Sequence, residues 1–284
     1  FWKTPTWPWC TSATATTAFP PCRADKEPDI RITGRTRIMF ILGDPVDHIV
    51  GTDILNRFFA ERGLDVAVSP LQIARSDLAE ALSMLRRTQN VAGFGITIPH
   101  KIAALSLVDE LTEAARDIGA VNFVRRNEDG TLTGHNVDGA GFVEGLERHG
   151  FALSGARALV VGAGGVGRAI AFALARAGAT RLVVANRTAS AAEDLAAAVN
   201  AAVPGLRAEP ASTAALPPLG EFDLVVNATA LGMKQDDPLP FDPAGLSPET
   251  TVAEVVMSPA ETRVLVAAET NGCRIVPGAR AMRC

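Results

Sequence analysis

The sequence predicts an α/β fold of two domains, the first of them built on a mainly parallel sheet. Three observations indicate this. The chain has 284 residues, which is enough for about two domains. Short apolar runs alternate with helical patterns in both halves, and such alternation is typical of parallel sheets. In the second half, a glycine-rich turn at 162–167 follows an apolar strand and opens a helix.

Residues 1–35 differ from the rest of the chain. They are rich in Thr, Pro and Trp, include all three tryptophans and show no helical or strand period. They lack the charged start, apolar middle and cleavage site of a signal peptide. We therefore expect a disordered or artefactual extension, and we leave these residues out of the fold.

The first half alternates from Arg37 onward. Apolar runs predict strands over 37–42, 64–71 and 91–98. Helical spacing predicts helices over 53–63 and 76–88, the second opened by a Ser-Asp cap, and helical segments over 100–109 and 110–119. The stretches 120–126 and 131–137 flank Asn-Glu-Asp-Gly and predict a hairpin.

A predicted helix over 138–150 links the two domains, and a second alternation follows it. Strands are expected at 156–162 and 181–187, and Ala-rich helices at 165–179 and 189–202. The alternation continues through 221–230, 251–256, 262–272 and 273–278.

Composition narrows the possible partners. The net charge of −4 gives no reason to expect a nucleic acid or an anionic membrane. No run approaches the ~18 uncharged apolar residues of a membrane-spanning helix. Cys10, Cys22, Cys273 and Cys284 show no CxxC spacing. This pattern favours a reducing, cytoplasmic location and argues against a metal site.

The turn at 162–167 has the GxGxxG spacing of dinucleotide-binding sites. Gly162 suits a tight turn, Gly164 lets the backbone approach a pyrophosphate, and Gly167 allows close packing of helix on strand. The pyrophosphate would lie at the N-terminus of the following helix, where free N–H groups favour an anion. The spacing alone is a weak signal, but its place between an apolar strand and a helix predicts a dinucleotide site.

The next strand ends at Asn186, Arg187 and Thr188. A site for NAD usually has an acidic residue near this point, which holds the ribose 2′-hydroxyl, and this chain has none there. The planar guanidinium of Arg187 suits a 2′-phosphate instead. The sequence therefore favours NADP, although an exposed arginine without a ligand is the alternative.

Lys101 and Asp138 are the candidate catalytic pair. A hydride transfer to a nicotinamide needs a group that takes the alcohol proton, and a positioned lysine can do this when a carboxylate orients it. Lys101 follows the strand at 91–98, and Asp138 begins the linking helix. Taken singly, each has a simpler interpretation: a solvated loop lysine and a helix N-cap.

The sequence resembles the shikimate dehydrogenase family from about Gly43 to Gly278. The matching stretches, in order, are GDPVDH at 43–48, GITIPHK at 95–101, GAVN at 119–122, GHNVDG at 134–139, GAGGVG at 162–167, NRT at 186–188, NATALGM at 227–233 and VAEVVMSPAET at 252–262. Together, in this order and spacing, these motifs are highly specific.

The resemblance implies a substrate domain over 36–138, a Rossmann NADP domain over 139–277 and a remnant of a closing helix over 278–284. It implies reversible hydride transfer between shikimate, or a related cyclic hydroxy acid, and NADP in the chorismate pathway to aromatic amino acids. We expect a monomer or a homodimer. Lys101 and Asp138 match the catalytic positions, and Thr97 and Asn122 match substrate-binding positions. The implied cofactor residues are Gly162, Ala163, Gly164, Gly165, Val166, Gly167, Asn186, Arg187, Thr188, Asn227, Ala228, Thr229, Val255 and Gly278.

The chain also departs from the family on the substrate side. Where the family has two serines that bind the substrate carboxylate, this chain has Ile49 and Gly51. The family's asparagine is Gly95 here, and its tyrosine is Met257. The closing helix is expected to be missing or cut short. Two alternatives follow: a divergent relative with a different alcohol substrate, or a catalytically weak NADP-binding protein.

Overall fold

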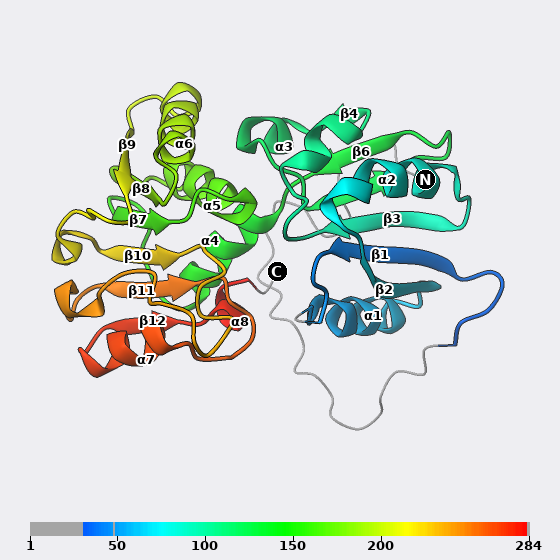
Figure 1. Ribbon diagram of the computed structural model, residues 1–284. Helices are drawn as coiled ribbons and strands as arrows, with labels where there is room; N and C mark the ends of the chain where they lie inside the picture. The colour runs from blue at the N-terminus through cyan, green and yellow to red at the C-terminus, as the bar shows by residue number, and fades with distance from the viewer. Residues whose placement is uncertain (1–30, 48, 283–284) are drawn as a thin grey trace.

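The computed structural model describes residues 31–47 and 49–282. Two six-stranded sheets stand side by side and are connected by helix α4 (Asp138–Arg148), as Figure 1 shows. The extension expected over 1–35 lies outside the described residues except for 31–35, which are exposed. The next residue, Thr36, is buried. Cys10, Cys22 and Cys284 are also outside the described part, whereas Cys273 is a buried free thiol.

The first sheet confirms the mainly parallel arrangement. Strand β1 lies parallel to β2 and β3, and β4 lies parallel to β6. The hairpin strand β5 is antiparallel to both of its neighbours. In the order β2-β1-β3-β5-β6-β4, the strands are β1 (Arg37–Gly43), β2 (Val66–Gln72), β3 (Val91–Ile96), β4 (Glu110–Leu111), β5 (Phe123–Arg126) and β6 (Leu132–His135).

Helices cover both faces of this sheet. Phe59 of α1 (Gly51–Glu61) packs with Met39 and Ile41 on one face. Leu82 of α2 (Leu78–Arg87) packs with Leu42 on the other. A third helix, α3 (Glu113–Ile118), and two 3-10 turns, η1 (Arg75–Asp77) and η2 (Ala103–Leu107), complete the domain.

The second sheet is parallel throughout and has the strand order of a Rossmann fold. In the order β12-β11-β10-β7-β8-β9, its strands are β7 (Arg157–Val161), β8 (Arg181–Asn186), β9 (Arg207–Ser212), β10 (Leu224–Asn227), β11 (Thr251–Glu254) and β12 (Arg274–Val276). Its helices are α5 (Gly165–Arg176), α6 (Ala189–Ala202), α7 (Arg263–Thr270) and α8 (Gly278–Ala281), with 3-10 turns η3 (Leu219–Glu221) and η4 (Pro243–Gly245).

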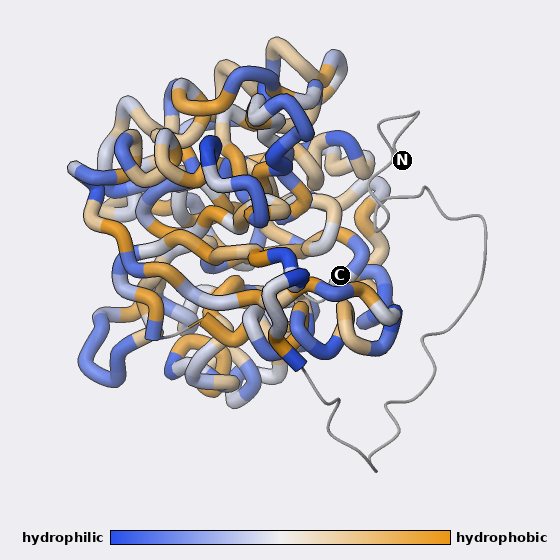
Figure 2. Tube along the Cα trace, turned by 90° about the vertical axis from the view of Figure 1, so that its right-hand side faces the viewer, coloured by the Kyte–Doolittle hydropathy of each residue, from blue (hydrophilic) through white to orange (hydrophobic). Residues whose placement is uncertain are grey.

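Apolar side chains fill both faces of the second sheet. Val160 and Val184 face α5 and α6, and Leu159 and Val252 face α7. Figure 2 shows the apolar stretches running through the interior along the strands, with hydrophilic segments at the turns. Strands buried on both faces explain the continuous apolar runs in this half of the sequence. None of the helices in the described part is long and apolar enough to cross a membrane.

Three local predictions were wrong. The segment 100–109 forms only the 3-10 turn η2, because the carbonyl of Lys101 accepts from the amide of Val121 and is not available to continue a helix. In 110–119 the first two residues pair with β6 as β4, so the helix begins at Glu113 after Thr112, whose hydroxyl caps it. Asp77 occupies the N-cap of α2, but its side chain caps nothing.

Candidate active site

The glycine-rich turn joins β7 to α5, and each of its three motif glycines meets a different constraint. Gly162 has a φ of +116°, and a Cβ there would lie 2.8 Å from the carbonyl oxygen of Ala228. A Cβ on Gly167 would lie 1.9 Å from the carbonyl oxygen of Gly162, so helix and turn pack without space for a side chain. Gly164 is exposed and has open space where its Cβ would be. A pyrophosphate can therefore reach the backbone at Gly164, and the residues present fit a dinucleotide.

The end of β8 supports the same turn. The amide oxygen of Asn186 accepts a hydrogen bond of 3.2 Å from the backbone N–H of Ala163, and its amide nitrogen donates to the carbonyl of Thr188. Arg187, between them, is exposed. Asn186 thus ties the turn to the segment that carries Arg187, where the adenosine ribose of a dinucleotide would lie.

The loop after β10 lies on the other side of the turn. The amide oxygen of Asn227 accepts from the hydroxyl of Thr229 at 2.6 Å and from its backbone N–H at 3.1 Å. The amide nitrogen of Asn227 donates to the carbonyl of Leu231 at 3.0 Å. Ala228 of this loop is the residue that closes on Gly162. Among the other expected cofactor residues, the N–H of Val255 donates to Asn227, and Gly278 packs against Val256 too closely for a side chain.

Lys101 and Asp138 meet, as their assignment to a pair requires. The ammonium nitrogen of Lys101 lies 2.5 Å from Oδ2 of Asp138, and their side chains are 11% and 9% exposed. Asp138 is the first residue of α4 and its side chain makes no cap. The N-cap interpretation of this aspartate is therefore wrong.

Two asparagines hold Asp138 in place, one through its carboxylate and one through its backbone. The amide nitrogen of Asn122 donates to Oδ1 of Asp138 at 2.8 Å, and its amide oxygen accepts from the backbone N–H of Val137. Asn136 accepts from the backbone N–H of Asp138 and donates to the carbonyl of Ala120. With Lys101 on Oδ2 and Asn122 on Oδ1, both carboxylate oxygens are engaged. Asn122, expected on the substrate, also orients the partner of the lysine.

The pair lies where the two domains meet. A Cβ on Gly165 would be 2.7 Å from Cβ of Lys101, so the glycine-rich turn contacts the lysine directly. On the neighbouring helix turn, Nε of Arg168 donates to the carbonyl of Ile118 at 2.6 Å, and burial lowers the pKa of Arg168. Arg176 of α5 pairs with Asp117 of α3. These contacts hold the glycine-rich turn and the start of α5 against the side chain of Lys101 and against α3.

The substrate side of the first sheet is apolar at the positions that depart from the family. Ile49 packs against the core cluster of Met39, Ile41, Phe59 and Val68, and a Cβ on Gly51 would contact Ile41 at 3.6 Å. Gly95 faces the same isoleucine. Phe123, which pairs with Gly95 across the sheet, packs on this cluster as well. Thr97 follows this wall, half-buried, with its amide bonded to the carbonyl of Leu42.

One buried acid was not among the expected site residues. Glu254 ends β11 with no exposed surface, and burial raises its pKa to about 7. Its Oε2 accepts from Thr262 at 2.9 Å and lies 3.5 Å from the amide nitrogen of Asn227. Asn136 and Arg168 were also missed, because their contacts are with backbone carbonyls of segments that are distant in the sequence. In the sequence, Glu254 lies within the matching stretch at 252–262 and beside the expected cofactor residue Val255, but nothing there indicates that it is buried.

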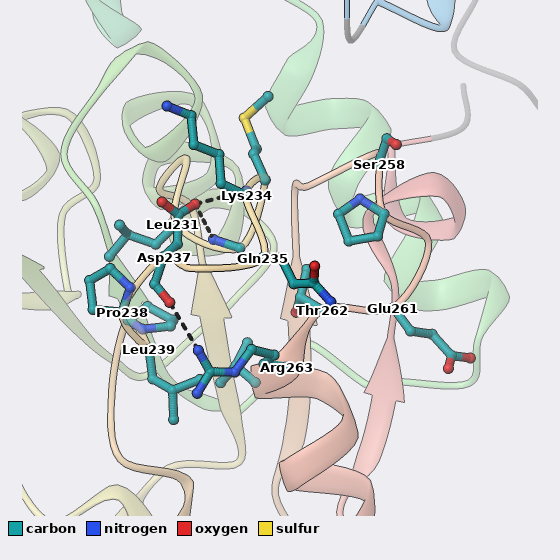
Figure 3. A pocket seen from close by; sticks show the side chains of 15 residues that line it. Leu231, Lys234, Gln235, Asp237, Pro238, Leu239, Ser258, Glu261, Thr262 and Arg263 are labelled. Atoms are coloured by element: carbon teal, nitrogen blue, oxygen red, sulfur yellow. Dashed lines mark hydrogen bonds between the residues drawn. The ribbon is translucent and has the colours of Figure 1, made fainter.

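A cavity of about 430 Å³ opens between the loops that follow β10 and β11 (Figure 3). Leu231, Leu239 and Pro259 are among its apolar lining residues, and Thr262 also reaches it. Asp237 accepts from the backbone N–H groups of Gly232 and Lys234, as the dashed lines show. The cavity therefore lies beside the loop that begins at Asn227.

Family models match most of the described chain. Residues 41–124 match the shikimate dehydrogenase substrate binding domain, and residues 145–232 match shikimate / quinate 5-dehydrogenase. A shikimate dehydrogenase (NADP(+)) of Rubrobacter xylanophilus is 41% identical over 249 residues, which cover 87% of each chain.

Solved structures of two dehydrogenases or reductases are similar to this chain over most of its length. The shikimate 5-dehydrogenase of Thermus thermophilus, in complex with NADP(H) and shikimate, superposes with a TM-score of 0.75 at 34% identity, covering 87% of this chain and 88% of that one. The ligand-free 5-ketofructose reductase of Gluconobacter sp. strain CHM43 gives a TM-score of 0.75 at 33% identity, covering 88% and 89%. Because both family models match and a curated relative is 41% identical, the chain belongs to the shikimate dehydrogenase family.

Proposed function

We propose that this chain is an NADP-dependent oxidoreductase that transfers a hydride between shikimate, or a related cyclic hydroxy acid, and NADP. The names of its relatives support the reaction and the cofactor. The observation that carries the proposal is the position of Lys101, which is paired to Asp138 and in contact with Gly165 of the glycine-rich turn. This position supports an acid/base role for Lys101 beside a dinucleotide bound at the turn.

Lys101 is the acid/base group of the proposed reaction. In the oxidative direction its nitrogen takes the hydroxyl proton as the hydride leaves the carbinol carbon, and in the reductive direction it returns that proton. Asp138 stabilises the ammonium form and holds it in place, and Asn122 fixes the carboxylate. When bound, NADP supplies the hydride acceptor. Thr97 and Asn122 are proposed to contact the substrate.

The proposed cofactor site contains the turn and the ends of three strands. The N-terminal N–H groups of α5 bind the pyrophosphate, and Arg187 binds the 2′-phosphate. Asn227, Ala228 and Thr229 line the nicotinamide half, with Val255 and Gly278 beside them. Gly162, Ala163, Gly164, Gly165, Val166, Gly167, Asn186 and Thr188 complete the set.

A second candidate function is reduction of a neutral polyhydroxy ketone. The apolar wall around Ile49, Gly51 and Phe123 favours it, because these positions give a carboxylate no donor. The resemblance to a 5-ketofructose reductase at 33% identity supports it too. A catalytically weak NADP-binding protein is the less favoured alternative, since the lysine–aspartate pair is complete.

The remaining proposals concern organisation and location. We propose a substrate domain over 36–138 and a cofactor domain over 139–277, supported by the separate sheets at 37–135 and 157–276. The buried free thiol of Cys273 is in keeping with a reducing cytoplasm. A role in the chorismate pathway follows from shikimate as substrate, and a monomer or homodimer is proposed.

The experiment is a turnover assay with NADP over shikimate, quinate and neutral polyols. The first proposal predicts that shikimate gives the highest kcat/KM. A neutral polyol that gives the highest kcat/KM would favour the second. NADP binding without turnover of any alcohol would contradict both.

A further inference from the structure

Glu254 is a buried carboxyl group whose place is unusual for a glutamate. It ends β11 directly beside Asn227, the last residue of β10, and it has no exposed surface. An ionisable side chain is seldom fully buried unless a partner neutralises it. In the described structure Oε2 contacts only hydrogen-bond donors, Thr262 and Asn227, and Oε1 has no partner. Burying this group therefore costs free energy.

The contacts of Glu254 lead to the proposed cofactor loop. Asn227 links the carboxyl group to Thr229 and Leu231 through three hydrogen bonds, and the Thr229 hydroxyl accepts a fourth from the backbone N–H of Leu231, so that the loop is braced. Ala228 lies in the middle of this loop and closes on Gly162. The orientation of a single amide, that of Asn227, thus sets the loop against the glycine-rich turn.

Packing alone does not fix this loop from its outer side. The cavity of about 430 Å³ borders Leu231 and Gly232, so apolar contacts are missing there (Figure 3). Gly232 instead rests on Thr262, at 3.0 Å from where its Cβ would lie. Thr262 is the residue whose hydroxyl donates to Glu254. The carboxyl group therefore connects the two residues that hold the loop, Asn227 before it and Thr262 behind it.

We propose that Glu254 is a positioning residue for the dinucleotide site, which holds Asn227 and Thr262 so that the loop from Asn227 to Leu231 keeps the shape that receives the nicotinamide half of NADP. This inference rests on the proposed function. It assigns a role to a side chain that touches neither the substrate nor the reacting atoms.

The charge of Glu254 links this role to pH. Burial raises its pKa to about 7, while Thr262 and Asn227 act in the opposite direction. Charged groups on the neighbouring elements face solvent: Lys234, Glu261, Arg263, Glu269, Arg274 and Arg280 are exposed. Asp237 is half-buried and accepts from two backbone N–H groups. The ionised carboxylate accepts more strongly from Asn227 and Thr262 than the neutral acid does. The loop is therefore best held above about pH 7.

The test compares wild type, Glu254→Gln, and Glu269→Gln as a matched control on the exposed face of α7. The dissociation constant of NADP is measured between about pH 6 and pH 8. In wild type and the control, the dissociation constant of NADP falls by roughly tenfold as the pH rises across this range, which is the effect of about one charged hydrogen bond. In Glu254→Gln this pH-dependent step in NADP affinity is absent. The 2′-phosphate of NADP titrates near pH 6 in all three proteins, so it cancels in the comparison.

A second variant keeps the inference testable if the first folds poorly. Thr262→Val removes a donor to the carboxylate, which raises the pKa of Glu254 further. It therefore moves the pH step in NADP affinity upward without abolishing it.

Two results would overturn the inference alone. One is a pH-dependent step in NADP affinity that survives in Glu254→Gln, and the other is a step that stays at the wild-type pH in Thr262→Val. A wild-type protein that does not bind NADP would overturn the proposed function as well.

Discussion

The ammonium nitrogen of Lys101 lies 2.5 Å from Oδ2 of Asp138, and the other oxygen of that carboxylate receives the amide of Asn122. The lysine lies in the turn after β3 and the aspartate at the start of α4, so two segments that are distant in sequence meet at one nearly buried ion pair. A buried pair of this kind is costly unless each charge is hydrogen-bonded, and here both are. Such a fixed and hydrogen-bonded pair supports the acid/base role that we propose for Lys101.

Asp138→Asn should lower kcat and leave NADP affinity nearly unchanged. The substitution keeps the shape but removes the charge that holds the ammonium group, so the acid/base group loses its position. We expect a loss of roughly 10²-fold or more, as for other disturbed acid/base groups. Steady-state kinetics with a separate NADP titration checks this. Asp65→Asn, at an exposed aspartate, is the control. A variant with full kcat would remove Asp138 from the mechanism.

Arg187→Ala should weaken NADP much more than NAD. Arg187 is exposed at the end of β8, next to the Asn186 that braces the glycine-rich turn. A charged hydrogen bond to the 2′-phosphate contributes ~1.5–3 kcal/mol, or roughly 10- to 100-fold in affinity. Titration of both cofactors measures the ratio, and Arg207→Ala, at an exposed arginine of β9, serves as control. An equal loss for both cofactors would argue against a phosphate contact.

Gly51→Ser should lower the KM for shikimate with little effect on kcat. A side chain fits there, because a Cβ would make an ordinary contact of 3.6 Å with Ile41. A donor to the carboxylate acts equally on the ground state and the transition state, so it changes KM alone. One donor should give up to ~10-fold, and the double change with Ile49→Ser up to ~100-fold. Ile49→Ser also removes core packing, so the single variant is the cleaner test.

An unchanged KM in both variants would show that the substrate carboxylate does not lie at this wall, or that the substrate has none. Under the second candidate function, the same variants should instead worsen the KM for a neutral polyhydroxy ketone.

Glu254→Gln should gain stability relative to wild type as pH rises. The pKa of Glu254 is raised from 4.5 to about 7 on folding, so the folded state holds the proton more tightly than the unfolded chain. Its contribution is fully present below about pH 4.5 and is lost by about pH 7. The shift corresponds to at most on the order of 3 kcal/mol. Melting temperatures at about pH 5 and pH 8 should therefore differ between the two proteins mainly at pH 8. The same difference at both values would contradict the buried titration.

The sequence predicted the elements with strong periodicity. Helix α6 was predicted with its observed bounds, and β1, β7 and β8 were placed to within a residue or two. Strand β9 was missed, because its sequence has no alternation and contains Pro210, which an edge strand tolerates. The segments 100–109 and 110–119 were assigned as helical because the backbone contacts that end or replace a helix there come from distant residues.

The candidate site likewise contains residues that the sequence identified and residues that it did not. Gly162, Gly164, Gly167 and Lys101 belong to local motifs, and local motifs can be read from one sequence. The roles of Arg168, Asn136 and Glu254 depend on which carbonyl, amide or loop the fold brings to them. A single sequence has no signal for such contacts, because they depend on the packing of one segment on another.

The most direct test of the proposed function is the reduction of NADP by shikimate in wild type, Lys101→Ala and Lys234→Ala, with NADP affinity measured in each. Lys234 is exposed, so its variant controls for loss of a lysine. The proposed function predicts shikimate-dependent formation of NADPH by wild type and Lys234→Ala, with kcat lower by ~10²–10⁴-fold in Lys101→Ala at nearly unchanged NADP affinity. A Lys101→Ala protein that turns over at the wild-type rate would contradict it.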